Sequence, residues 1–97
     1  MPTYIAMLKW TSQGLQEIKN SPSRLDAARK GFEKFGVKMK EFYMVTGRHD
    51  MITILEAPDD AAVAKALLFG ASQGRITSET CRAFTETEYR QILKELT

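Results

Sequence analysis

The chain has 97 residues, 43% of them hydrophobic and 27% charged, which is an ordinary composition for a folded globular domain. Fourteen Lys and Arg residues against 12 Asp and Glu leave a net charge of +2, far from the one-sided field of a surface that binds nucleic acid. A chain of this length predicts one domain, over residues 1–97, with one hydrophobic core.

The number of cysteines and the length of the apolar stretches indicate in which cellular compartment the protein is expected. Cys81 is the single cysteine, so the chain can form no internal disulfide, which is typical of proteins in a reducing compartment. The chain does not start with a basic segment followed by an apolar one, and no stretch of about 18 apolar residues occurs. We therefore expect a cytoplasmic protein that does not contact a membrane.

Residues 3–10 predict a first strand that is covered on both faces, because both of its alternating sets of side chains are largely apolar. Leu15 and Ile18 then predict a short helical turn. A longer helix follows, with Ser21 or Ser23 as its N-cap and Gly36 at its end. Its apolar side chains recur at helical spacing: Leu25, Ala28, Phe32 and Phe35.

The next segments, 37–46 and 51–56, predict two strands joined by a short loop that starts at Gly47, which is typical of a tight hairpin. A second long helix is expected to begin within residues 57–60, where a proline and two carboxylates suit a helix N-terminus. Residues 75–84 predict a more polar strand at a sheet edge. A capping box at 85–88 then predicts a terminal helix with one apolar stripe, formed by Tyr89, Ile92, Leu93 and Leu96.

This order of elements predicts an α+β fold, a ferredoxin-like βαββαβ domain with a C-terminal helix and a four-stranded antiparallel sheet. Right-handed crossovers place both long helices on one face of the sheet and leave the other face open. Since strands 3–10 and 51–56 are apolar on both sides, an open face would expose a large apolar patch. We therefore expect the chain to associate with itself through the sheet, as a homodimer or a higher oligomer.

Several short motifs, in their order and spacing, resemble the GYD family. The matching pieces are Tyr4-Ile5, Lys9-Trp10-Thr11 with Gly14, Ser21-Pro22 with Arg24, Tyr43, Gly47-Arg48-His49-Asp50, Glu56-Ala57-Pro58-Asp59 and Arg82-Ala83-Phe84-Thr85. The resemblance implies a dimeric α/β-barrel type of ferredoxin-like fold, with self-association, and implies no catalytic assignment. The chain departs from the family at one motif position, where His49 stands in place of the family's tyrosine.

The hairpin loop carries the only histidine, and His49 is a weak candidate for an acid or base in catalysis. The alternative is that its ring only packs at the tip of the hairpin, as a tyrosine would. Asp50 follows it directly, so in a strand the two side chains would point to opposite faces. Gly47 and Asp50 are expected to have structural roles, the glycine through its backbone angle and the aspartate as an acceptor for turn N–H groups.

Trp10, Tyr43, His49 and Arg82 are the candidate ligand-binding residues, expected to line a cleft between the sheet and the helices together with Glu56. The alternative is that the aromatic residues anchor the core or an interface and that Glu56 pairs with Arg82 or a lysine. Two functions therefore stay open: binding of a small molecule, or catalysis on it without a cofactor, and a structural or interaction module for assembly or protein docking.

Other chemistry has little support in the sequence. No second cysteine or histidine accompanies Cys81 at ligand spacing, so no metal site is expected. No nucleotide-binding fingerprint or nucleophile elbow occurs, and no cofactor is expected. Lysines at 30, 34, 38 and 40 form the densest basic cluster, but without an RNA-binding aromatic run they are expected to be solvated. No nucleic-acid partner is expected.

Overall fold

The computed structural model describes residues 1–96. The strands are β1 (Thr3–Trp10), β2 (Lys38–Met44), β3 (Met51–Glu56) and β4 (Ile76–Ala83). The helices are α1 (Ser12–Gln16), α2 (Ser21–Glu33), α3 (Asp60–Ala71) and α4 (Glu86–Lys94), with a 3₁₀ turn η1 (Ile18–Asn20) before α2. The predicted order of strands and helices, including the terminal helix, is confirmed.

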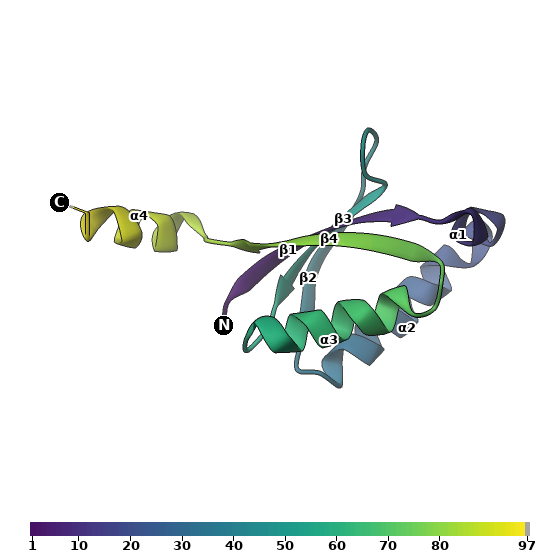
Figure 1. The fold of residues 1–97 in the computed structure, drawn as a ribbon, viewed down its shortest axis with the longest axis horizontal. Helices are drawn as coiled ribbons and strands as arrows, with labels where there is room; N and C mark the ends of the chain where they lie inside the picture. The colour runs from purple at the N-terminus through teal and green to yellow at the C-terminus, as the bar shows by residue number, and fades with distance from the viewer. Residues whose placement is uncertain (97) are drawn as a thin grey trace.

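The four strands form one antiparallel sheet in the order β2-β3-β1-β4, so the first strand lies in its interior beside the hairpin. Helices α2 and α3 both lie against the same face of this sheet (Figure 1). The side chains of β1 alternate between the two faces of the sheet, as in any pleated strand. Tyr4, Ala6 and Leu8 are buried towards the helices, and the strand residues between them face the other way.

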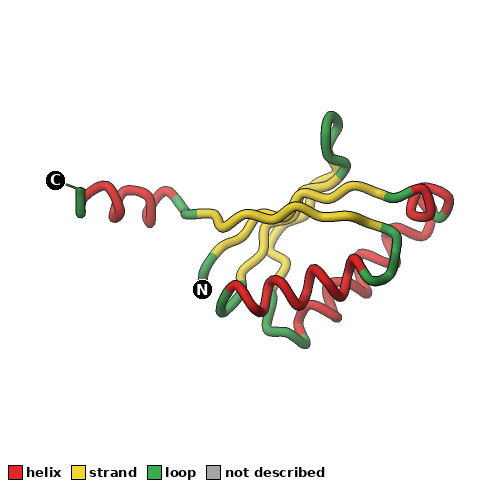
Figure 2. Tube along the Cα trace, in the orientation of Figure 1, coloured by secondary structure: helices red, strands yellow, loops and turns green. Residues whose placement is uncertain are grey.

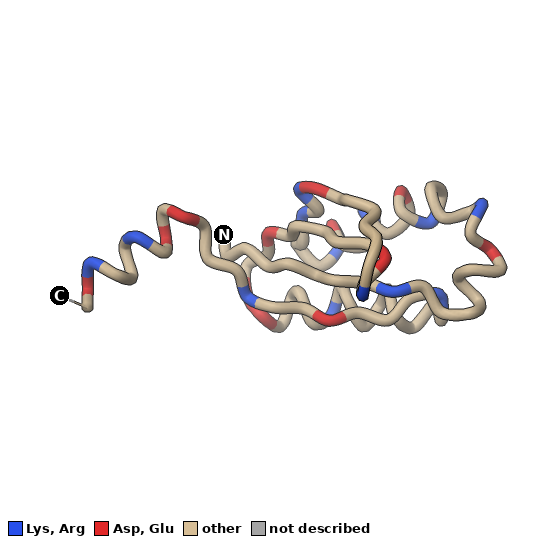
Figure 3. Tube along the Cα trace, turned by 90° about the horizontal axis from the view of Figure 1, so that it is seen from above, with Lys and Arg blue, Asp and Glu red and all other residues tan. Residues whose placement is uncertain are grey.

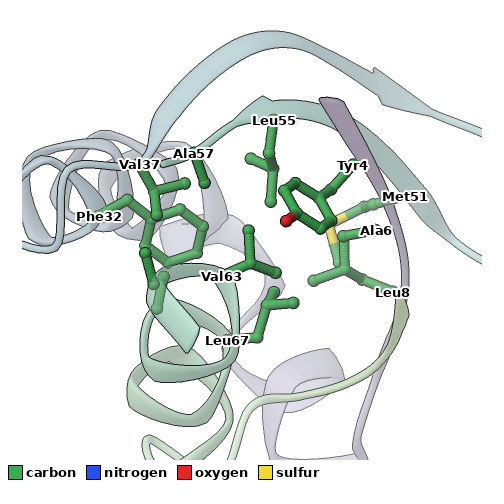
Figure 4. Close-up of a cluster of buried hydrophobic side chains, with 12 residues drawn as sticks. Tyr4, Ala6, Leu8, Phe32, Val37, Met51, Leu55, Ala57, Val63 and Leu67 are labelled. Atoms are coloured by element: carbon green, nitrogen blue, oxygen red, sulfur yellow. The ribbon is translucent and has the colours of Figure 1, made fainter. Parts of the chain in front are cut away.

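The core fills the space between the sheet and the two long helices. Figure 4 shows Tyr4, Met51 and Leu55 from the strands facing Val63 and Leu67 from α3. Leu55 is fully buried at 0% exposure, on the strand face that the sequence predicts to be apolar. Such alternation on a central strand stabilises the fold because each inward side chain loses its contact with water.

The opposite side of the sheet carries a second apolar set, which we call the open face: Ile5, Met7, Ile52 and Ile54. Direct register pairs place Ile5 beside Ile54 and Met7 beside Ile52. Helices α2 and α3 lie on the other side of the sheet (Figure 1), and these four residues are only partly buried. The prediction that β1 and β3 are apolar on both sides is therefore confirmed.

Two predicted boundaries were wrong, and a third is confirmed. The N-cap position of α2 is Asn20 rather than Ser21 or Ser23, because η1 already has near-helical backbone angles and leads directly into the helix. The hairpin loop spans 45–50 instead of starting at Gly47, because beyond the Met44–Met51 pair the two segments are joined through the bond from the Val45 N–H to the Asp50 carbonyl, while the N–H of Asp50 donates to Leu8 of β1. Helix α3 begins within the predicted range, after its N-cap Asp59, whose carboxylate accepts from the N–H of Ala62 at 2.9 Å.

Helix α4 extends from the end of β4 away from the rest of the molecule (Figures 1 and 2). The Cα radius of gyration is 14.6 Å, compared with about 12.5 Å expected for a compact domain of this length. None of the residues of α4 is buried. The capping box predicted at its start is present, with Thr85 and Glu88 bonded reciprocally.

Within residues 1–96, no helix combines the length and the apolar character needed to cross a membrane. Acidic and basic residues are interspersed along the chain and do not collect on one side (Figure 3).

Candidate functional site

The loop between β2 and β3 is held to the sheet by Asp50. Its carboxylate Oδ2 accepts a hydrogen bond from the backbone N–H of Trp10 at 3.0 Å, and its own N–H donates to the carbonyl of Leu8 at 2.8 Å. The carbonyl of Asp50 accepts from Val45 at 2.9 Å, which closes the hairpin. The acceptor role expected of Asp50 is thus directed at the end of β1 and not at a turn N–H.

His49 lies on the side of the sheet that carries the open face. Its Nε2 is 3.1 Å from Oε2 of Glu79, which faces the same way as Met7 in the register with β4. The imidazole side chain is 18% exposed, whereas that of Glu79 is 69% exposed. Gly47, with φ of +118°, lets the loop turn at a point where an L side chain would be strained. The contact to Glu79 therefore ties the loop across β1 to the edge strand.

Tyr43 also faces away from the helices, since it pairs with Ile52 of the open face and is 53% exposed. Its hydroxyl donates to the carboxylate of Glu41, and this hydrogen bond raises the pKa of Tyr43 above its ordinary value. Nearby on the same side, Glu56 pairs with Lys40, with Nζ and Oε1 3.9 Å apart. This pairing with a lysine agrees with the alternative expected for Glu56.

Arg82 connects the sheet to α4. Its guanidinium carbon lies 5.7 Å from the centroid of the Tyr4 ring and 4.4 Å from that of Phe84. It donates to the carbonyl of Thr3 at 3.2 Å and to that of Ala83, and it lies 3.8 Å from the carboxylate of Glu88. Arg82 thus packs where α4, which we call the arm, leaves the body of the domain.

Two pKa values near Arg82 are displaced. The hydroxyl of Tyr4 donates to the carboxylate of Asp60 at the start of α3, and this bond, with burial, raises the pKa of Tyr4. The backbone N–H of Thr85 donates to Glu88 at 2.9 Å and lowers the pKa of that carboxyl group. The Tyr4 hydroxyl therefore acts as a protonated donor, and the Glu88 carboxyl group acts as a deprotonated acceptor.

A cavity of about 270 Å³ lies between the sheet and the two long helices. Its walls are mostly aromatic and aliphatic side chains from all four strands and both helices, among them Trp10, Phe32, Phe42, Met51 and Ile76. It exists because small residues, including Ala28 and Gly70, stand where the helices pass over the sheet. A Cβ atom at Gly70 would lie 3.7 Å from Ile76, which is an ordinary van der Waals contact.

One end of the cavity is polar and carries two arginines. Arg24 donates to the main-chain carbonyl of Glu17 at 2.7 Å, and Arg75 Nε lies 3.2 Å from the Glu17 carboxylate. The hydrogen bond from Arg75 lowers the pKa of Glu17. Gly14 belongs to the same corner, where an added Cβ would come within 2.2 Å of the carbonyl oxygen of Arg75, so only glycine fits.

The structure does not bring the four predicted ligand-binding residues together. Trp10 lines the cavity, whereas Tyr43 and His49 lie on the other side of the sheet and Arg82 packs at the base of α4. The roles of all four in binding stay predictions. Sequence reasoning did not predict that Arg24 and Arg75 line the cavity. The available signals were their positions, one just inside the start of a predicted helix and the other directly after a predicted turn.

An imidazole held by a carboxylate, as in His49 and Glu79, can move a proton. Neither residue lines the 270 Å³ cavity. Within residues 1–96, no three His, Cys, Asp or Glu side chains converge as metal ligands would. The described residues thus present an apolar cavity, an open sheet face and an amphipathic helix, α4, of which no residue is buried.

These features define the class: a small α+β protein with one face of an antiparallel sheet under two helices and the other face uncovered. The chain belongs to the GYD family, since the GYD domain matches residues 4–93. It is 34% identical over 95 residues to a Thermus thermophilus protein, the glutamine synthetase and cystathionine beta-lyase binding protein, and the alignment covers 97% of this chain and 100% of that one.

The fold is also found in a solved structure. The crystal structure of the protein TTHA0845 from Thermus thermophilus superposes with a TM-score of 0.55 at 20% identity, over 88% of this chain and 95% of that one. At this level of identity the likeness concerns the fold alone.

Proposed function

We propose that this chain is a protein-binding module that docks on partner proteins through α4 and associates with itself through the open face. The observation that carries this proposal is the exposed apolar stripe of the arm. A relative that matches along its whole length is named for binding glutamine synthetase and cystathionine beta-lyase. Enzymes of these two kinds are therefore the first partners to test. The single exposed thiol, Cys81, suits work in a reducing compartment such as the cytoplasm.

The stripe consists of Tyr89, Ile92, Leu93 and Leu96, which are 55%, 42%, 41% and 75% exposed. A helix of nine residues is marginal in water by itself, because nucleation costs more than a few hydrogen bonds return. Here the capping box and the Glu86–Arg90 pair, at 2.8 Å, favour the helix locally. A preformed amphipathic helix with an unburied stripe suits docking into an apolar groove of another protein.

Self-association is supported by the open face. Its four aliphatic side chains lie on two adjacent central strands, where a monomer would leave them in contact with water. A second copy, packed sheet to sheet, would cover them and produce the dimeric α/β-barrel form of a ferredoxin-like domain. Tyr43 and the His49–Glu79 pair would then lie at the rim of this interface.

The two surfaces can be tested separately. Binding to purified glutamine synthetase and cystathionine beta-lyase from the same organism is measured by isothermal titration calorimetry, for the wild type, for Ile92→Asp and for Gln91→Asp. Gln91 lies on the opposite side of the same helix, so it controls for added charge and for any loss of helix. We expect Ile92→Asp to weaken binding at least tenfold, since it buries a charge, and Gln91→Asp to bind as the wild type does.

Equal binding by both variants, or no binding of either enzyme, would contradict the docking proposal.

The oligomeric state is measured by light scattering, for the wild type and for Ile54→Lys in the open face. We expect a dimer or larger species for the wild type and a monomer for Ile54→Lys. A wild-type monomer at micromolar concentration would contradict association through the sheet.

The cavity favours a second candidate function, the binding of a small molecule between the sheet and the helices. Its volume is just below the range of about 300–1,000 Å³ that is usual for ligand sites, and its walls are apolar with a few polar groups. Of the predicted ligand-binding residues, Trp10 belongs to this site. Thermal-shift screening would test this candidate, and the absence of any stabilising compound would count against it.

A further inference from the structure

We infer that the cavity under the sheet is a site for a small carboxylate with an apolar body, such as a medium-chain carboxylic acid. This inference rests on the second candidate function above, the binding of a small molecule, and names the class of its ligand. It is independent of protein docking through α4, which uses another part of the molecule.

The walls decide the nature of the body. The sheet contributes Trp10, Phe42 and Met51, α2 contributes Phe32, and α3 contributes Leu67. Thr53, a polar residue of β3 that lines the cavity, already has a hydrogen-bond partner, because its hydroxyl donates to the carbonyl of Glu41 at 2.7 Å. Most of the cavity therefore offers dispersion contacts and no hydrogen bonds, which suits an aliphatic or aromatic body.

The volume decides the size of the ligand. A water molecule occupies about 30 Å³ in the liquid, so a cavity of about 270 Å³ has room for roughly nine non-hydrogen atoms. This is the size of an eight-carbon acid.

The arginine end decides the charge of the head group. None of the described residues that line the cavity is acidic, whereas Arg24 and Arg75 both line it. The nearby Glu17 carboxylate pairs with Arg75, so two positive charges and one negative charge leave a net +1 at this end. Arg24 donates only to main-chain carbonyls, those of Glu17 and Gly14, among the hydrogen bonds of residues 1–96. An anionic head group would therefore complement this end, and a cationic one would not.

The site contains its own reporter. Trp10 is the only tryptophan of the chain, and it lines the cavity. A ligand that enters the cavity replaces water beside the indole ring, so the fluorescence of Trp10 should change and saturate with binding. No label is needed.

The test titrates the full chain with three probes that share one tail: octanoate, octanol and octylammonium. We expect octanoate to change the fluorescence saturably and to bind about tenfold or more tightly than either other probe. Arg24→Gln should lower the affinity for octanoate roughly tenfold and leave the affinity for octanol unchanged. Because the comparison among probes uses the wild type, it does not depend on the folding of any variant.

A matched pair of variants locates the site. Ala28→Leu places a larger side chain in the cavity, whereas Ala64→Leu makes the same change at an exposed position of α3 outside it. We expect Ala28→Leu to abolish the binding of octanoate and Ala64→Leu to leave it unchanged, with circular dichroism to verify the fold of both. Unchanged binding by Ala28→Leu would overturn the inference, because the ligand would then lie elsewhere.

The outcomes separate the ligand class from the site. If octanol binds as tightly as octanoate and Ala28→Leu abolishes both, the carboxylate class is overturned and the small-molecule site stands. If none of the three probes gives a saturable change, and no compound stabilises the protein in the thermal-shift screen, both the inference and the second candidate function are overturned.

Discussion

Replacing Asp50 with alanine should loosen the junction between the hairpin and β1. The carboxylate accepts one backbone hydrogen bond, from Trp10 at 3.0 Å, and a bond to a charged acceptor contributes about 1.5–3 kcal/mol to stability. Asp50 is only partly buried, so water can replace some of this interaction, and we expect a loss of about 1.5 kcal/mol. For a domain of this size, such a loss lowers Tm by about 6–12 °C.

The control is Asp26→Ala, which removes a carboxylate that is 76% exposed and only pairs with Arg29 at 3.5 Å. We expect it to change stability by less than about 0.5 kcal/mol. Asp50→Asn keeps an acceptor without the charge and should fall between the two. The assay is chemical denaturation, combined with hydrogen exchange of the Trp10 amide, which should lose protection in Asp50→Ala. The reasoning is refuted if Asp50→Ala and Asp26→Ala are equally stable and the amide stays protected.

The remaining predictions concern the core, the arm and pH. Leu55→Ala should destabilise the protein by about 3–5 kcal/mol in urea denaturation, because Leu55 is fully buried, whereas Leu68→Ala at 70% exposure should cost under about 0.5 kcal/mol. Thr85→Ala should cost about 1 kcal/mol of local helix stability in α4, seen as lost helical chemical shifts while the melting of the sheet is unchanged; Thr87→Ala is the control. Because the folded-state pKa of Glu88 is lowered, its contribution to α4 should be present above pH 4.5 and lost as the pH falls through its folded pKa, and Glu88→Gln should lack this acid transition in circular dichroism. The folded-state pKa of Tyr4 is raised, so its contribution should be present below pH 10.0 and lost as the pH rises through its folded pKa; Tyr4→Phe should not show this alkaline loss in denaturation measurements.

Much of the local structure can be derived from the sequence because the signals act over a few residues. The capping box at Thr85 and Glu88 and the alternation in β1 and β3 each depend on near neighbours, and each prediction is confirmed. The predictions of the N-cap of α2 and of the extent of the hairpin loop were wrong. For α2 the boundary is decided by the 3₁₀ turn directly before it, and for the loop by the hydrogen bonds between Asp50 and the distant strand β1.

The same distinction between local signals and long-range contacts applies to the candidate sites. The sequence by itself determined the order of the elements, the two-sided apolar strands and the amphipathic terminal helix, since hydrophobic period and capping chemistry are written in consecutive residues. Only the tertiary structure decided which side chains meet. Strand register places Trp10 in the cavity and Tyr43 on the other side of the sheet, and the packing of the chain brings Arg75, directly before β4, to Glu17, whose carbonyl accepts from Arg24. Residues brought together by pairing and packing across tens of positions leave no local pattern, so the arginine end of the cavity could be found only from the folded chain.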